Sequence, residues 1–274
     1  MFRHFLVTRF NLRVDSWHQT KNGEDVLTED WLEKRFYLFE NFCLPSVKNQ
    51  QNQHFTWCIY FDENTPVSYQ KRISGLTEGY ANIRIFYING ADALNSSLVT
   101  FIKSQVDTKV KYIITTRLDN DDMIHQDFIS VIQSLFVPAD MAVIDIQNGY
   151  QLCIENNNTE VRNYSNRFNP FISIIENLSG IETVFSKPHF EWKLVSKIIE
   201  YKDSRLWCEI IHQSNKLNVV KKGIRKNYHF NASAFGLKKS IICLEPASYI
   251  FVFNFKVFIK GMSNALLNRI KKRN

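Results

Sequence analysis

The sequence has little glycine and proline, no paired cysteines and no long uninterrupted apolar run. Nine glycines and six prolines in 274 residues exclude collagen-like and low-complexity chains. The five cysteines are widely spaced and form no CxxC pair, so the sequence indicates neither a zinc site nor a disulfide framework. The apolar segment at the N-terminus is too short for a signal peptide. We therefore expect a cytosolic protein whose thiols are free and mostly buried.

The composition is that of a globular protein with an excess of positive charge. Hydrophobic residues make up 45% and charged residues 22% of the chain, which is long enough for one large domain with an appended tail. The net charge of +7 favours anionic partners such as nucleotide phosphates or an acidic membrane surface. No nucleic-acid-binding module is recognisable, so nucleic acid is not an expected partner.

Apolar strands alternate with amphipathic helices through the first half of the chain. We expect strands over residues 2–8, 55–61, 83–88, 112–116, 142–146 and 151–154, with a β-hairpin at the polar turn over residues 156–159. We expect helices over residues 28–45, 68–76, 93–106 and 127–136. In the first helix Thr28 is the N-cap, and Trp31, Leu32, Arg35 and Phe36 recur at helical spacing. This order predicts an α/β fold with a mostly parallel, helix-covered sheet.

The second half is less regular. The pattern predicts helices over residues 172–177, 192–200 and 206–212, and short strands over 183–185 and 219–220. We divide the chain into a domain over residues 1–235 and a basic, apolar helical tail over 236–274. The apolar residues and basic end of the tail fit a helix lying on an anionic bilayer, and the alternative is a terminal helix packed on the core.

An acidic cluster follows the strand expected over residues 112–116. After Arg117 and Leu118 the chain reads Asp119-Asn120-Asp121-Asp122, and Asp62 ends another expected strand. Carboxylates crowded at a strand end repel one another unless a cation lies among them, and α/β sheets bind ligands at the carboxyl ends of their strands. An EF-hand calcium loop is excluded, because Met123 and Ile124 stand where a ligand and a glycine are required. The cluster predicts a metal and nucleotide-diphosphate site.

Several segments in order resemble the rhamnosyltransferase family of bacterial glycosyltransferases, which have the GT-A fold. The segments are TRFNLR (8–13), DWLEKRFYLFENFCLPSVKNQ (30–50), FTWCIYFDENTP (55–66), TTRLDNDDMIHQDFI (115–129), NPFISIIE (169–176) and WCEIIHQSN (207–215). Taken together they are more specific than an isolated Asp-x-Asp. The resemblance implies a GT-A-like, Rossmann-like mixed sheet, and it leaves the C-terminal tail outside.

The resemblance also implies roles for individual residues. Nucleotide-sugar contacts would come from Thr8, Arg9, Asn11, Asp62, Arg117, Asp119 and Asn120. Asp119 would face the ribose or the metal, and Asp121 would bind a divalent cation, Mn²⁺ or Mg²⁺, that bridges the two phosphates. His212 would be a third metal ligand or a diphosphate contact. The acceptor side would include Tyr150, His189 and Trp207.

An inverting transfer requires a carboxylate base, and the candidates are Asp203 and Glu209. We prefer Glu209, because its apolar neighbours Trp207, Ile210 and Ile211 would raise its pKa toward the working range. On the helix expected over residues 206–212, His212 would share a face with Glu209.

The expected activity is a metal-dependent transfer of a sugar such as rhamnose from a nucleotide-diphosphate donor to a glycan or lipid-linked glycan. We expect the protein to be peripheral at the inner face of the cell membrane. Two alternatives remain. A nucleotidyltransferase would use a similar sheet but usually has a glycine-rich loop after its first strand, and TRFNLR has no glycine. The other is a non-catalytic glycan- or membrane-binding protein with a degenerate site.

Overall fold

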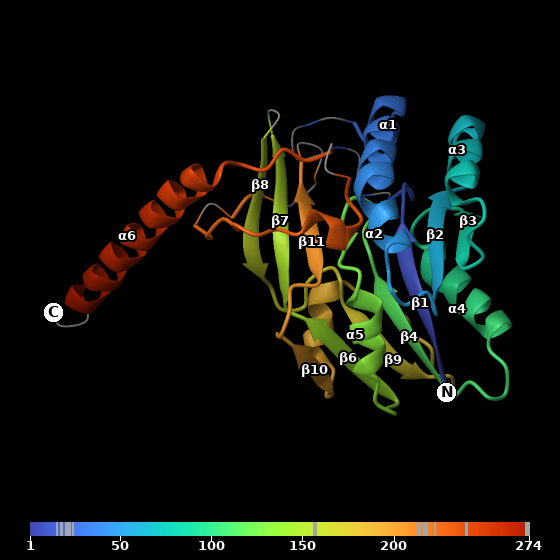
Figure 1. Ribbon diagram of the computed structural model, residues 1–274. Coiled ribbons are helices and arrows are strands. Elements are labelled where there is room, and N and C mark those ends of the chain that lie inside the picture. The colour runs from blue at the N-terminus through green and yellow to red at the C-terminus, as the bar shows by residue number, and fades with distance from the viewer. Residues whose placement is uncertain are drawn as a thin grey trace.

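A computed structural model describes residues 1–14, 16, 19, 23, 25–155, 158–212, 215, 219–221, 223–238 and 241–271. In this part of the chain the main sheet has seven strands in the order β10-β6-β9-β4-β1-β2-β3, and a second sheet has four in the order β5-β11-β7-β8 (Figure 1). The main sheet comprises β1 (Phe2–Arg9), β2 (Thr56–Asp62), β3 (Ile83–Ile88), β4 (Tyr112–Arg117), β6 (Met141–Ile146), β9 (Ser173–Asn177) and β10 (Ile198–Tyr201). The second comprises β5 (Met123–Ile124), β7 (Asn148–Glu155), β8 (Asn158–Ser165) and β11 (Trp207–Ile211).

Four neighbouring strands of the main sheet, β3, β2, β1 and β4, are parallel. Their registers pair Arg9 with Tyr60 and Val7 with Arg117, so the carboxyl ends of these strands meet at one edge. β9 runs antiparallel between β4 and β6, and β10 is parallel to β6. The prediction of a mixed, mostly parallel α/β sheet is confirmed, and a ligand site is expected at this edge.

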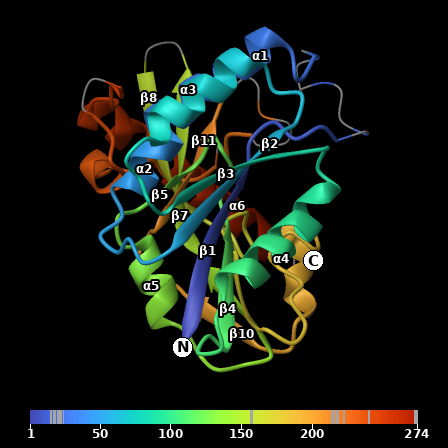
Figure 2. The same cartoon turned by 90° about the vertical axis from the view of Figure 1, so that its right-hand side faces the viewer.

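Helices cover both faces of the main sheet. One face carries α1 (Glu29–Leu38), which continues through the π-helical turn η1 (Phe39–Cys43) into α2 (Leu44–Lys48), and it also carries α3 (Val67–Thr77) and α5 (Phe128–Ser134). The other face carries α4 (Ala93–Gln105), whose buried leucines pack with β1 and β2. Figure 2 shows α5 and α4 on opposite sides of β1. Thr28 caps α1 as expected, because its Oγ1 accepts a hydrogen bond from Trp31 N at 3.2 Å.

The expected hairpin is present as the antiparallel pair β7–β8. Three expected helices, over residues 172–177, 206–212 and 192–200, are wrong. The first two segments contain the strands β9 and β11, and the third contains the end of the 3₁₀ helix η2 (His189–Leu194) and most of β10. Short apolar runs do not distinguish a buried strand from a buried helix, and these strands are buried by pairing with partners distant in sequence. The strands expected over 183–185 and 219–220 are wrong as well, since these residues are not in strands.

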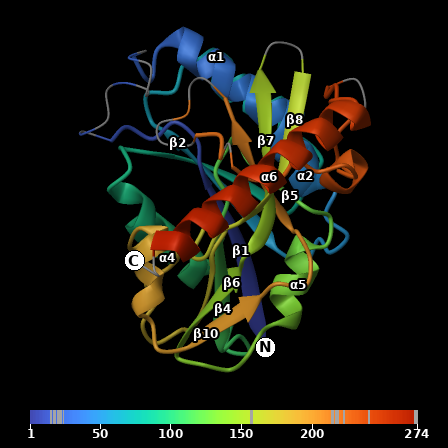
Figure 3. The ribbon, with the colours of Figure 1, turned by 90° about the vertical axis from the view of Figure 1, so that its left-hand side faces the viewer.

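The long helix α6 (Ala247–Lys271) follows the 3₁₀ helix η3 (Ala232–Phe235) and extends away from the sheets (Figure 1). In Figure 3, viewed from the left of Figure 1, α6 crosses in front of the sheets. The expected helical tail is therefore present. Within the described residues, no helix combines the length and apolar character needed to cross a membrane. The division of the chain at residue 235 stays a prediction.

Candidate active site

The acidic turn Asp119–Asp122 connects the two sheets. It follows β4 in the main sheet and leads into β5, which pairs with β11 in the second sheet. Leu118, directly before it, is fully buried, and its N–H donates to Val7 O at 3.0 Å. Because both ends are held by sheets, the carboxylates are fixed where the carboxyl ends of β1 and β4 meet.

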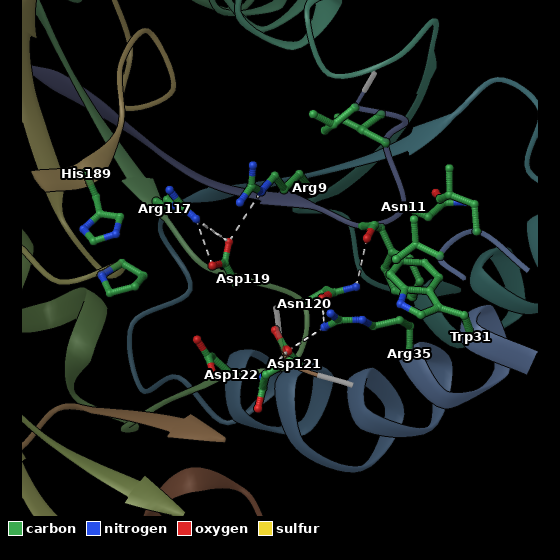
Figure 4. Close-up of a pocket in the computed structure, with 17 residues that line it drawn as sticks. Arg9, Asn11, Trp31, Arg35, Arg117, Asp119, Asn120, Asp121, Asp122 and His189 are labelled. Carbon is green, nitrogen blue, oxygen red and sulfur yellow. Dashed lines mark hydrogen bonds and ion pairs between the residues drawn. The ribbon is translucent and has the colours of Figure 1, made fainter. Parts of the chain in front are cut away.

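A cavity of about 250 Å³ opens at this turn (Figure 4). Its polar side is formed by Arg9, Asn11, Arg35, Arg117, Asp119, Asn120, Asp121, Asp122, His189 and Asn215. Its apolar lining residues are Phe10, Leu12, Val14, Val26, Leu27, Trp31 and Pro170. A cleft lined by apolar side chains together with a few convergent charged groups has the character of a small-molecule site.

Asp121 is the best-partnered carboxylate of the turn. Its Oδ2 lies 2.5 Å from Arg35 Nη1 and 2.9 Å from His212 Nε2, and Asn215 Nδ2 donates to it at 3.4 Å. Burial opposes ionisation of Asp121, but the charge of Arg35 and the contact with His212 outweigh it, so its pKa is lowered well below the usual carboxyl range. Asp121 is therefore an anion held between α1 and the segment after β11.

Asp119 contacts a different pair of arginines. Arg117 Nη2 donates to Asp119 Oδ2 at 2.9 Å, and Arg9 Nε lies 3.8 Å from Asp119 Oδ1. Burial again opposes ionisation, and the two guanidinium groups lower the pKa of Asp119 in spite of it. Three arginines among the described residues thus line the cavity beside two ionised carboxylates.

Asp122 and Glu209 have the opposite behaviour. Burial raises the pKa of Asp122 well above its usual range, and the nearby charges of Asp121 and Glu209 raise it further. Its Oδ1 accepts a hydrogen bond from Ile210 N on β11 at 2.9 Å. Burial also raises the pKa of Glu209, against a hydrogen bond of 2.7 Å from Gln151 Nε2 on β7.

The pKa of Glu209 is therefore raised, as expected. Its secondary structure differs from the expectation. It lies on strand β11 rather than on a helix, so the expected helical face shared with His212 is wrong. Glu209 instead shares a strand face with Trp207, while Cys208 and Ile210 pack into the core of the second sheet. His212 reaches Asp121 from just beyond the strand end.

The other residues expected to bind nucleotide divide into two groups. Asn11 and Asn120 line the cavity, and Asn120 Nδ2 donates to Phe10 O at 3.0 Å. Thr8 and Asp62 lie outside the set of described residues that line it. Thr8 Oγ1 accepts from Trp57 Nε1 within the sheet, and Asp62 accepts from Asn64 N in its own loop and from Arg13 N in the segment after β1.

Of the expected acceptor-side residues, His189 lines the cavity and donates from Nδ1 to Phe168 O at 2.5 Å. Trp207 is core: it stacks on Phe171 with ring centroids 5.0 Å apart and donates from Nε1 to Ile146 O. Tyr150 packs edge-on against Phe230 and Phe235. Asp203 is exposed in the bend between β10 and β11.

A divalent cation fits part of the expected ligand set. Asp121 and His212 bring a carboxylate oxygen and an imidazole nitrogen together, and both are ligands for such ions. Asp119 is turned toward Arg117 and Arg9 instead. Among the described residues, no three His, Cys, Asp or Glu side chains are grouped to hold a metal ion.

Sequence reasoning missed two residues of α1, Trp31 and Arg35. Both were noted only as members of a helical stripe. An arginine within the buried stripe of an amphipathic helix was the available signal, because a buried guanidinium needs an anionic partner. That partner, Asp121, is 86 residues away in the sequence.

The sequence profile of a family described as "Putative rhamnosyl transferase" matches residues 3–223. No curated protein matches significantly. Among solved structures, residues 1–349 of S. aureus TarS in complex with UDP-GlcNAc are 11% identical with a TM-score of 0.43, covering 81% of this chain and 62% of that one. A "putative nucleotide-diphospho-sugar transferase" of Desulfovibrio desulfuricans G20 is 9% identical with a TM-score of 0.38, covering 78% and 82%.

This chain spans about 60% of the TarS fragment. The family match covers the whole main sheet, the acidic turn and β11. On this match, the chain belongs to the family described as putative rhamnosyl transferases.

Proposed function

We propose that the cavity binds a nucleoside-diphosphate sugar and that the protein transfers the sugar to a glycan acceptor. The observation that carries this proposal is the convergence of Arg9, Arg35 and Arg117 on the acidic turn, at the carboxyl ends of the parallel strands. Guanidinium groups bind phosphate oxygens through paired hydrogen bonds. The apolar lining that includes Leu12 and Trp31 suits a nucleobase.

Arg35 has an additional property that supports an anionic ligand. Its side chain is 7% exposed, and its Nε is a buried donor without a hydrogen-bond acceptor among the described residues. A buried donor of this kind costs free energy unless a ligand oxygen satisfies it. A diphosphate oxygen in the cavity would do so.

Glu209 is our candidate for the base of an inverting transfer. The acceptor hydroxyl oxygen would form a bond to the anomeric carbon, while the bond from that carbon to the diphosphate oxygen breaks with its electron pair. The hydroxyl proton would pass to a carboxylate oxygen of Glu209. Its raised pKa brings proton acceptance closer to neutral pH.

We propose Asp121 and His212 as protein ligands of a divalent cation, Mn²⁺ or Mg²⁺, with Asp119 near it. A cation held there would offset the negative charge that develops on the departing diphosphate. Arg35, Arg117 and Arg9 bind the same phosphates from the protein side, so the chain itself supplies much of the positive charge.

We also propose that the sugar is rhamnose, that the acceptor is a lipid-linked glycan of a bacterial surface polysaccharide, and that transfer takes place at the inner face of the cell membrane. The family match supports the sugar class. The basic, apolar α6 supports the location.

The proposal is tested by titrating the protein with uridine-, thymidine- and guanosine-diphosphate sugars in a calorimeter, with and without Mn²⁺. We expect saturable binding of at least one donor and its loss in Arg117→Met. The control Arg205→Met removes an arginine outside the cavity-lining set, which bonds to the carbonyls of Gly149 and Tyr164. Absence of binding for every donor, or equal binding by Arg117→Met, would exclude the proposed donor site.

A further inference from the structure

Helix α6 has two separate stripes of side chains. Ile250, Phe253, Asn254 and Val257 recur at the spacing of one helix face and are buried or half-buried. A second stripe, which we call the outer stripe, recurs at i, i+4, i+7, i+8 and i+11. The outer stripe consists of Phe251, Phe255, Phe258, Ile259 and Met262, which are 46–63% exposed. Phe258 lies at the edge of the stripe, 5.9 Å from its ring centroid to Arg225 Cζ. An exposed apolar stripe along one side of a helix is typical of a docking surface.

The inner face of α6 is firmly attached to the second sheet. Lys226 N donates to Asn254 Oδ1 at 2.8 Å, and Asn254 Nδ2 donates back to Lys226 O at 3.0 Å. The buried ammonium of Lys226 lies 2.7 Å from carboxylate oxygens of both Glu160 and Glu245. Arg162 lies over the ring of Phe253, with 4.7 Å from its Cζ to the centroid. These contacts hold the inner face of α6 against the protein and leave the outer stripe exposed.

The charge around the outer stripe is of one sign. Lys256 and Lys260 lie one helical turn apart and are exposed beside it. Residues 247–274 contain no Asp or Glu, and their last six residues include Arg269, Lys271, Lys272 and Arg273. Two copies of such a helix would bring like charges together, whereas a surface of lipid phosphates would neutralise them.

We propose that the outer stripe of α6 docks on the surface of an anionic lipid bilayer. Phe255 and Ile259 enter the boundary between headgroups and acyl chains, and Lys256 and Lys260 contact lipid phosphates. The proposal identifies α6 as the part of the protein that contacts the membrane at the location proposed above. It rests on α6 and not on the donor site, so the two proposals are tested separately.

The test measures co-sedimentation of the full-length protein with phosphatidylcholine vesicles and with vesicles that also contain phosphatidylglycerol. We expect strong binding to the anionic vesicles only, weakened by salt. Phe255→Glu/Ile259→Glu should lower the partition coefficient about a hundredfold, because two large apolar side chains no longer insert. Lys256→Gln/Lys260→Gln should lower it about tenfold or more. The control Leu194→Glu, at an 80% exposed apolar residue on η2, should bind as the wild type.

Equal binding to both vesicle types, or wild-type binding by Phe255→Glu/Ile259→Glu, would overturn the proposal. So would a dimer in light scattering that Phe255→Glu/Ile259→Glu dissociates, because the stripe would then belong to a second copy. Donor binding by calorimetry and the melting temperature should be unchanged in this variant. A loss of vesicle binding with intact donor binding therefore reports on α6 alone.

Discussion

The contact between Arg35 and Asp121 makes a quantitative prediction about stability. The two side chains are only 7% and 10% exposed and lie 2.5 Å apart. Arg35→Met keeps an unbranched apolar stem but leaves a buried carboxylate without its guanidinium. Breaking a buried pair from one side costs about 3–5 kcal/mol. We expect a loss of that size in the free energy of unfolding, lowered somewhat by the remaining contact with His212.

Denaturant unfolding of the wild type, Arg35→Met, Asp121→Asn and the double variant measures this coupling. The double variant should be more stable than the sum of the single losses predicts, because it no longer contains an unpaired charge. The control is Arg72→Met. Arg72 Nε also lies 2.5 Å from a carboxylate, that of Glu40, but its side chain is 31% exposed, so the loss should be about 1 kcal/mol or less. A loss in Arg35→Met no larger than that in Arg72→Met would refute the reasoning.

The same pair determines a pH dependence. The pKa of Asp121 is lowered in the folded protein, so its ionised form adds stability that is present at neutral pH. That stability is lost as the pH falls below the ordinary carboxyl range. In Arg35→Met the acid-induced loss should be smaller, and added Mn²⁺ should restore part of the stability at neutral pH if the cation binds Asp121.

Three further predictions concern other residues. Glu209→Gln should lower the turnover rate about 10²–10⁴-fold in kinetic assays, with little change in donor affinity by calorimetry. Full turnover by this variant would exclude Glu209 as the base. Gly149→Ala should cost about 1–3 kcal/mol in denaturant unfolding, because its Cβ would lie 2.1 Å from the buried Trp207 ring, whereas Gly75→Ala in α3, with open space around it, should be neutral or stabilising. The pKa of Glu176 is raised to about 7, mainly by burial, from an ordinary value of 4.5. The free energy of unfolding of the wild type should therefore fall by up to about 3 kcal/mol as the pH rises between these values. Glu176→Gln cannot titrate at this position, so its free energy of unfolding, measured with denaturant, should change less with pH over the same range.

The parts of the fold that follow from local pattern were predictable from the sequence. β1, β2 and β4 each contain a run of apolar or β-branched residues, and the acidic turn stands out because three carboxylates follow one of them. β9 and β11 were not predictable as strands, because their apolar runs become strands only by pairing with β4, β6 and β7, which are distant in the sequence.

The same distinction applies to the site. Asp119, Asp121 and Arg117 are neighbours in the sequence, so their convergence could be expected. Arg35 could not be placed, because its contact with Asp121 depends on how α1 lies on the sheet. Trp207 shows the reverse error: an aromatic residue near a candidate base proved to be core.

The central claim is that Asp121 belongs to the donor site of a glycosyltransferase. It is tested most directly by release of nucleoside diphosphate from a panel of nucleotide sugars, with Mn²⁺ or Mg²⁺ and a glycan acceptor. The wild type should release diphosphate from at least one donor, thymidine-diphosphate rhamnose being the first to try. Asp121→Asn should remain folded and release none above background, while Asp203→Asn should match the wild type. Undiminished release by folded Asp121→Asn would contradict the account.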